Sequence, residues 1–187
     1  MLAAQTIETE TVLTTRAQQG DRDAFTELVR SHYAGVVNVV YRMCGDANLA
    51  EDATQETFLN AWLNLSSFRP GTSLRNWLYR IGVNAALDAL RREGAAAVEF
   101  DTEWMVDPAS GPEGEALQKE LSAAVQKAIL SLTEANRAIL VLREYGSLSY
   151  AEIAAALDIP AGTVMSRLNY ARSRLREILA PEFGEKS

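Results

Sequence analysis

The segment 148–177 constrains the fold more than any other part of the chain, because it encodes two helices joined by a very short turn. Residues 149–152 read Ser-Tyr-Ala-Glu, a capping box in which the serine and the glutamate satisfy free N–H groups at a helix start. That helix ends near Leu157, a turn follows around Asp158-Ile159, and Pro160 opens the next helix, where its missing N–H is not needed. The segment predicts a helix-turn-helix.

The last helix carries one apolar stripe at steps of three and four residues, formed by Val164, Leu168, Ala171, Leu175 and Ile178. At about 100° per residue, a separate polar face contains Thr163, Ser166, Arg167, Tyr170 and Arg174. An anchored helix with such a face can present side chains to base edges in the major groove of DNA. We therefore predict duplex binding, with a solvated basic face on an ordinary helical hairpin as the alternative.

The remaining sequence is also helical in character, which predicts an all-α fold. Apolar residues recur at helical spacing over 15–92 and again from about residue 118, and no β-hairpin signal interrupts them. Between them, residues 94–117 hold glycine, proline and acidic residues without a sustained period, as expected for a flexible acidic linker. A chain of 187 residues, 48% of them hydrophobic, can form two small helical domains, at 15–93 and 118–182.

Helix ends in the first domain are predicted from glycine and from capping residues. Gly45 is expected to stop the second helix, and Asn48 to cap the third with Glu51 as its capping-box partner. Thr72 or Ser73 is expected to cap the fourth helix, after a Pro-Gly break.

The formal net charge of −7 hides an uneven distribution. Residues 68–92 contain five arginines against one aspartate, a balance of +4. The stretch 93–120 has eight acids against one lysine, a balance of −7, and 160–179 has four arginines against one glutamate, a balance of +3. A partner responds to charge within about 10 Å at moderate salt, so two basic patches can face nucleic acid although the whole chain is acidic.

Few residues in this chain suit enzymatic or metal chemistry. His32 and Cys44 are the only histidine and the only cysteine, and both are expected to pack inside the fold. We therefore expect no catalytic site, no metal, no cofactor and no disulfide. No apolar run approaches the roughly 18 residues of a membrane span, and the N-terminus is acidic rather than basic, so we expect a cytoplasmic protein without membrane insertion.

Two further motifs precede the linker and the helix-turn-helix: AEDATQETFLNAW at 50–62 and FRPGTSLRNWLYRIGVNAALDALRR at 68–92. In this order and spacing the motifs resemble the extracytoplasmic-function (ECF) group of bacterial sigma factors, over roughly residues 16–180. The resemblance implies a factor that binds the RNA polymerase core and directs promoter-specific transcription initiation. It also implies an anti-sigma factor that holds the protein inactive.

The first of these motifs combines a core stripe with a distinct polar face. The stripe contains Phe58, Ala61, Trp62 and Leu65, and the separate face contains Asp52, Gln55, Glu56 and Leu59. By itself such a face is as often ordinary surface as an interface. The resemblance implies that it docks on the arginine-rich clamp helices of the polymerase's largest subunit, through charge-assisted hydrogen bonds.

The resemblance assigns the second motif to the −10 promoter element, where the duplex opens. A flipped base needs stacking partners and amide hydrogen bonds, and each stacked base contributes about 1–3 kcal/mol. The implied pocket residues are Phe68, Arg69 and Asn84, and the residues implied to follow the phosphates are Arg75, Arg80, Arg91 and Arg92. The alternative is that Asn84 only satisfies backbone groups in the core.

The same resemblance assigns the helix-turn-helix to promoter DNA at the −35 element. Two positions that are commonly basic in the family are Met165 and Tyr170 here, so the base preference does not carry over. The acidic linker has two interpretations, a mimic of nucleic acid in the polymerase's RNA exit path or a solvated spacer. Rival functions are a stand-alone DNA-binding regulator, which leaves the first two motifs unexplained, and a decoy that sequesters an anti-sigma factor.

Overall fold

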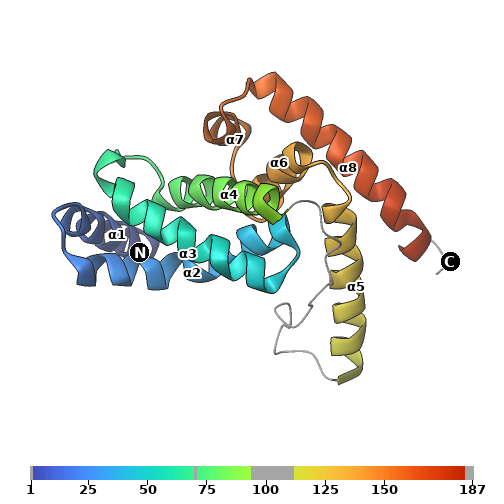
Figure 1. Ribbon diagram of the computed structural model, residues 1–187, viewed down its shortest axis with the longest axis horizontal. Coiled ribbons are helices and arrows are strands. Elements are labelled where there is room, and N and C mark those ends of the chain that lie inside the picture. Colours follow the sequence, from blue (N-terminus) through green and yellow to red (C-terminus); the bar gives the residue numbers. More distant parts are fainter. Residues whose placement is uncertain (1, 70, 94–111, 184–187) are drawn as a thin grey trace.

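The computed structural model describes residues 2–69, 71–93 and 112–183, and Figure 1 shows their helical arrangement. The elements are α1 (Leu2–Gln18), α2 (Arg22–Cys44), α3 (Ala47–Asn64), the 3-10 turn η1 (Leu65–Ser67), α4 (Leu74–Glu93), α5 (Pro112–Leu130), α6 (Glu134–Glu144), α7 (Tyr150–Leu157) and α8 (Ala161–Phe183). These residues include no strand, so the predicted all-α class is confirmed. None of these helices combines the length and the apolar character needed to cross a membrane.

Helices α1 to α4 form the first domain, and α1 extends beyond the region expected to be helical. We expected helix from residue 15, whereas α1 begins at Leu2. At the end of α1, Gln18 donates from Nε2 to the carbonyl oxygens of Leu65 and Phe68, at 3.0 and 2.9 Å. Helix α1 thereby holds the loop between α3 and α4, which carries two of the predicted DNA-contacting residues.

The junction between α2 and α3 is shorter than expected. Gly45 stops α2 with a φ of 76°, a left-handed conformation that glycine adopts without strain, as predicted. Asp46 then caps α3 by accepting a hydrogen bond from the N–H of Leu49 at 2.7 Å. The predicted cap at Asn48, with Glu51 as its partner, is therefore wrong. The residue directly after Gly45 already has the side chain and the extended backbone of an N-cap.

Other predicted caps are confirmed. Ser73 caps α4 by accepting from the N–H of Asn76 at 3.3 Å. The capping box at the start of α7 is complete, because Ser149 and Glu152 each accept from the other's backbone N–H, at 3.3 and 2.7 Å. Asp158 makes the turn of the helix-turn-helix in a left-handed conformation, and the stripe of α8 is fully buried at Val164, Leu168 and Ala171.

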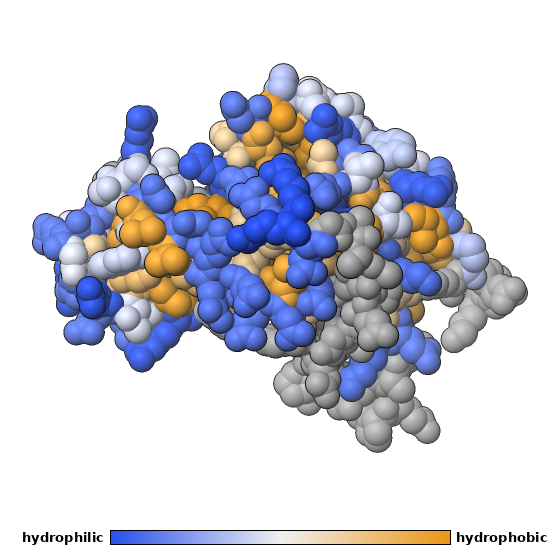
Figure 2. All heavy atoms as spheres, in the orientation of Figure 1, coloured by the Kyte–Doolittle hydropathy of each residue, from blue (hydrophilic) through white to orange (hydrophobic). Residues whose placement is uncertain are grey.

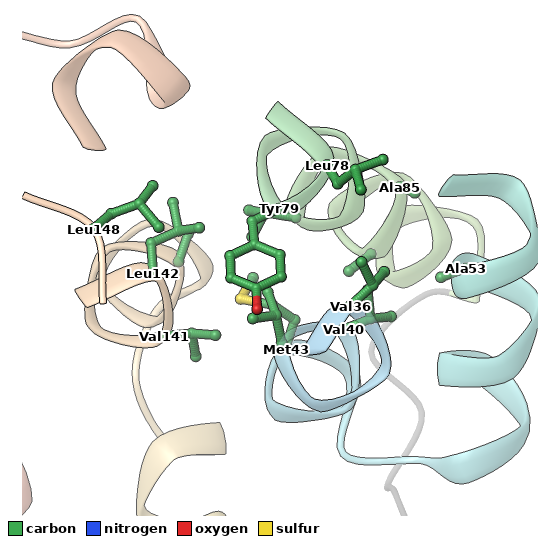
Figure 3. Close-up of a cluster of buried hydrophobic side chains, with 14 of the residues drawn as sticks. Val36, Val40, Met43, Ala53, Leu78, Tyr79, Ala85, Val141, Leu142 and Leu148 are labelled. Atoms are coloured by element: carbon green, nitrogen blue, oxygen red, sulfur yellow. The ribbon is translucent and has the colours of Figure 1, made fainter. Parts of the chain in front are cut away.

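The two domains pack against each other, which local sequence patterns did not indicate. Helices α2 and α4 of the first domain contact α5, α6 and α7 of the second, and the buried apolar residues form one continuous cluster. Figure 3 shows Tyr79 of α4 between Met43 of α2 and the α6 side chains Val141 and Leu142. A Cβ on Gly146 would stand 3.2 Å from the Tyr79 ring, so this glycine permits the close approach.

The predicted linker, 94–117, falls largely outside the described residues. Residues 94–111 are not among them, and the backbone is helical from Pro112 onward, so α5 begins inside the segment expected to be a linker. The flexibility of this segment and its role as a nucleic-acid mimic therefore stay predictions.

Cys44, at the end of α2, allows a test of how tightly this packing excludes solvent. The side chain is fully buried, and burial raises the pKa of its thiol to about 12. Because the thiolate is the reactive form, we expect the native chain to react very slowly with a maleimide at pH 8 and rapidly once urea unfolds it. Thiol titration of native and unfolded protein measures this, and prompt reaction of the native chain would contradict the buried position.

Candidate nucleic-acid and protein interfaces

The predicted −35 face lies on α8. A different side of this helix carries the apolar stripe, which packs against the other helices of the second domain. The exposed side chains of this face are Ser166, Tyr170 and Arg174, and the half-buried ones are Thr163 and Arg167. Tyr170 is 59% exposed, and Arg174 pairs with Glu177 on the same helix at 3.0 Å. Helical periodicity brings all five residues to one face. Their contact with DNA stays a prediction.

The opposite flank of α8 is partly used inside the protein. Arg172 donates from Nε and Nη2 to a carboxylate oxygen of Glu144 on α6, at 3.0 and 2.6 Å, and this hydrogen bonding raises the pKa of Arg172. Arg172 therefore braces α8 against α6. On the same flank Met165 is 51% exposed and Arg176 is exposed, so this side offers DNA an apolar group and a cation.

Three of the predicted −10 residues form a line along α4. Arg80, Asn84 and Arg91 are exposed and, at 3.6 residues per turn, share the side of α4 opposite its buried residues. Asp88 lies beside them and accepts a hydrogen bond from Arg91 at 2.8 Å. Since Asn84 is exposed, the alternative that it satisfies backbone groups in the core is wrong. We call Arg80, Asn84 and Arg91 the α4 line.

The other predicted arginines lie at separate edges of the α4 line. Arg75 lies near the Tyr79 ring, 5.9 Å from its centroid, on the side of α4 that approaches the second domain. Arg92 forms an ion pair with Glu56 of α3 at 2.8 Å. Arg69 is exposed on the loop before α4. The structure therefore does not gather the four arginines that were predicted to follow the phosphates into one row.

Phe68 lies inside the first domain. The side chain is 6% exposed, and its ring packs on Trp77 with centroids 5.3 Å apart and planes at 56°. In this position the ring is not presented to a base, although the pocket was predicted to use it. The neighbouring Arg69 is exposed, and its contact with a base stays a prediction. An aromatic residue beside a turn gives no local signal of whether it points inward or outward.

The α3 face that was predicted to bind polymerase lies at the surface, and its contact with polymerase stays a prediction. Asp52, Gln55 and Leu59 are exposed, Leu59 to 59%, and Glu56 is half-buried. Leu63 lies one turn beyond Leu59 on the same face and is 66% exposed. The sequence analysis did not place Leu63 on this face, although its spacing of four residues from Leu59 was the available signal. Figure 2 shows apolar surface on the part of the molecule where α3 crosses the view.

An ion pair connects the α3 face to the end of α4. Nη2 of Arg92 lies 2.8 Å from Oε2 of Glu56, and the hydrogen bond from Arg92 to Glu56 raises the pKa of the guanidinium. The pair is largely exposed, so it adds little to stability.

Comparison with known proteins decides the family. The family model for Sigma-70 region 2 matches residues 28–96, and the model for Sigma-70, region 4 matches residues 122–175. The ECF RNA polymerase sigma factor SigW of Bacillus subtilis is 34% identical over 174 residues, which cover 88% of this chain and 93% of SigW. The chain belongs to the ECF sigma factors of the sigma-70 family.

Solved structures of relatives share the architecture of this sigma factor. CnrH, solved in complex with the cytosolic domain of CnrY, is 26% identical and superposes with a TM-score of 0.68 over 92% of this chain and 98% of CnrH. The sigma factor RpoE from Bartonella quintana, solved in complex with the anti-sigma factor NepR, has the same fold at 22% identity, with a TM-score of 0.66 over 83% of this chain and 96% of RpoE.

Ser149 tests how far the helix-turn-helix depends on its cap. Replacing it by alanine removes the acceptor for the N–H of Glu152, so Ser149→Ala is expected to lower the free energy of unfolding by about 1 kcal/mol. Urea denaturation followed by circular dichroism measures the change. The control is Ser173→Ala on the exposed side of α8, which should change it by less than about 0.5 kcal/mol. Equal effects of the two variants would contradict the capping role.

Proposed function

We propose that this sigma factor binds the RNA polymerase core and directs transcription initiation from a specific promoter, with one helical surface for each task. The polar face of α8 reads the −35 duplex, the α4 line and Arg69 capture the −10 strand, and the α3 face docks on polymerase. The observation that carries the proposal is the presence of these three exposed and differently composed surfaces on a chain whose family is established.

The α8 face has the groups that major-groove recognition requires. Arg167 can donate two hydrogen bonds to guanine, Ser166 can bond either base type, and the exposed Tyr170 can contact a thymine methyl group. The buried apolar stripe of α8 holds the helix in place. A contact with a base therefore costs little conformational entropy of the backbone.

The α4 line has the groups that single-strand capture requires. Arg80 and Arg91 can bind successive phosphates, and the amide of Asn84 between them can donate to and accept from a base edge. Their position on one rigid helix favours an extended strand lying along α4. The overall charge of −7 opposes DNA binding by the isolated chain, so we propose that tight promoter binding requires polymerase.

The α3 face has the composition of a protein-binding surface. Asp52 and Gln55 can accept hydrogen bonds from arginine, and Leu59 and Leu63 provide the exposed apolar area that a stable contact buries. The proposed partner is the arginine-rich pair of clamp helices in the polymerase's largest subunit.

We propose that the chain has no catalytic site and needs no cofactor, because the polymerase supplies the chemistry. In the part of the chain that the structure describes, no group of three or more His, Cys, Asp or Glu residues could hold a metal ion. We also propose that it acts in the cytoplasm and that an anti-sigma factor controls it. The complex of RpoE with NepR, which has the same fold, supports such a partner.

The proposal is tested by run-off transcription with purified core polymerase on genomic DNA fragments. We expect discrete transcripts that define a common promoter sequence. A gel-shift assay with the same fragments separates the rival functions, since a stand-alone regulator would bind its operator without core. A decoy would bind an anti-sigma factor and yield no transcript. Either result would overturn the proposal.

The α3 face is tested by charge reversal. We expect Asp52→Arg combined with Glu56→Arg to weaken binding to core by at least about tenfold, because arginine would then face arginine on the polymerase. Fluorescence anisotropy with labelled chain measures the affinity, and circular dichroism checks the fold.

A matched control exists on α2. Asp23 and Glu27 have the same residue types and the same spacing of four residues, and both are exposed. Asp23→Arg combined with Glu27→Arg should leave core affinity within about twofold of the wild type. If the α3 variant keeps its affinity, or if both variants lose it equally, the docking assignment is wrong.

Arg167 is expected to specify one base pair of the −35 element. Arg167→Ala should remove about 1–3 kcal/mol of discrimination at that position and leave the preference at the others unchanged. Transcription from a library of −35 sequences measures this, with Arg176→Ala on the opposite flank as the control. Loss that is uniform across all sequences would show that Arg167 contacts phosphate rather than a base.

A further inference from the structure

The buried stripe of α8 defines which side of this helix points away from the protein. Helix α8 lies at the edge of the molecule in Figure 1 and packs on α5, α6 and α7. Its inward side is marked by three fully buried residues and one half-buried residue, Val164, Leu168, Ala171 and Leu175. At about 100° per residue, the direction opposite the mean of these four falls between Ser166 and Ser173. We call this the outward direction of α8.

Asn169 lies closer to the outward direction than the arginines of α8 do. By the same rotation per residue it is turned from that direction by about 50°, whereas Arg167 and Arg174 are turned by about 110° and 90°. Exposure agrees with this order, because Asn169 is exposed and Arg167 is half-buried. Tyr170 is turned by about 50° to the other side, so Asn169 and Tyr170 flank Ser166. The predicted −35 face does not include Asn169.

The side-chain amide of Asn169 is free to bind a partner outside the protein. Within the part of the chain that the structure describes, this amide has no hydrogen-bond partner. Two cations of the same helix are in use, since Arg172 and Arg174 each form an ion pair with a glutamate. An exposed amide can also be used by its own helix, as at Asn64 of α3, which donates to a carbonyl of α3 at 2.9 Å. Asn169 has neither kind of contact.

The residues around Asn169 allow its short side chain to reach the floor of a groove. The major groove is about 12 Å wide and an α-helix with its side chains is about 10–12 Å across, so the outermost side chains limit how deeply the helix enters. Near the outward direction of α8 these are small, namely Gly162, Ser166 and Ser173. A Cβ on Gly162 would have no heavy atom within 4 Å. The backbone of α8 can therefore approach the bases closely on this side.

The chemistry of an amide selects adenine among the four bases. The amide of Asn169 offers a donor and an acceptor side by side, and adenine presents the complementary pair in the major groove, the N7 acceptor and the N6 donor. Guanine presents two acceptors there, which would leave the amide oxygen without a donor, at a cost in free energy. A phosphate attracts cations more strongly than it attracts a neutral amide, so a base edge is the better partner.

We propose that Asn169 reads one adenine of the −35 element through two hydrogen bonds, from its amide nitrogen to N7 and from the adenine N6 to its amide oxygen. Arg167 and Asn169 lie on different sides of the outward direction, so they specify different base pairs. This inference rests on the proposed function, because it needs α8 to lie in the major groove of promoter DNA.

A library of −35 sequences tests this assignment. Core polymerase with the wild-type chain should prefer adenine at one position, and Asn169→Ala should reduce that preference about tenfold while the preferences at the other positions stay unchanged. Asn38→Ala is the matched control, an exposed asparagine on α2, and it should change none of them. A uniform loss over all sequences, or an unchanged adenine preference, would overturn the assignment.

An altered base tests the contact without altering the protein. In 7-deazaadenine a C–H group replaces N7, and base pairing with thymine is kept. With this base at the assigned position, transcription by the wild-type holoenzyme should fall about fivefold, because one hydrogen bond is lost. The Asn169→Ala holoenzyme should not distinguish the two templates. Equal sensitivity of wild type and variant would show that another residue contacts N7.

A gain of a new preference is the strictest test. Arginine donates two hydrogen bonds to guanine, so Asn169→Arg should shift the preferred base at the assigned position from adenine to guanine and leave the position specified by Arg167 unchanged. A purely structural role of Asn169 predicts no such shift. If Asn169→Arg keeps the preference for adenine, the assignment is wrong.

The two proposals fail in different ways. A wild-type chain that yields promoter-specific transcripts without an adenine preference that depends on Asn169 would remove this inference and keep the sigma function. A wild-type chain that yields no transcripts with core polymerase would remove the proposed function, and the assignment of Asn169 with it.

Discussion

One buried cation determines how the two halves of this molecule meet. The guanidinium of Arg137 joins the end of α2 to the end of α5 and to the following Leu132 carbonyl, so three chain segments converge on one side chain. Carbonyl oxygens carry only partial charge and replace water incompletely, which is why burial lowers the pKa of Arg137. Such a contact specifies geometry more than it adds stability.

Helix α4 connects this contact to the functional surfaces. Its buried side packs in the first domain, the opposite side presents the α4 line, and a third side, through Tyr79, meets the second domain (Figure 3). The strand-binding surface and the docking surface are therefore parts of one rigid element. Arg80 of the α4 line and Glu152 of α7 line the same groove, so the second domain lies beside this line at Arg80.

The elements that could be predicted from sequence are those whose signals are local. The capping box at Ser149, the stripe of α8 and the polar face of α3 each depend on spacing within one helix, and the structure has all three. The cap at Asp46 was missed because Gly45 shortens the junction. The inward position of Phe68 and the bridge made by Arg137 depend on segments distant along the chain, so periodicity contains no information about them.

Footprinting of the polymerase complex tests most directly whether one chain holds both promoter elements at once. Nuclease protection reports binding at −35, and permanganate reactivity of thymines reports unpaired bases near −10. The account predicts that both signals arise in the same complex and that both disappear when core polymerase is omitted. Strong −35 protection without polymerase, or protection with polymerase but no reactive thymines near −10, would contradict it.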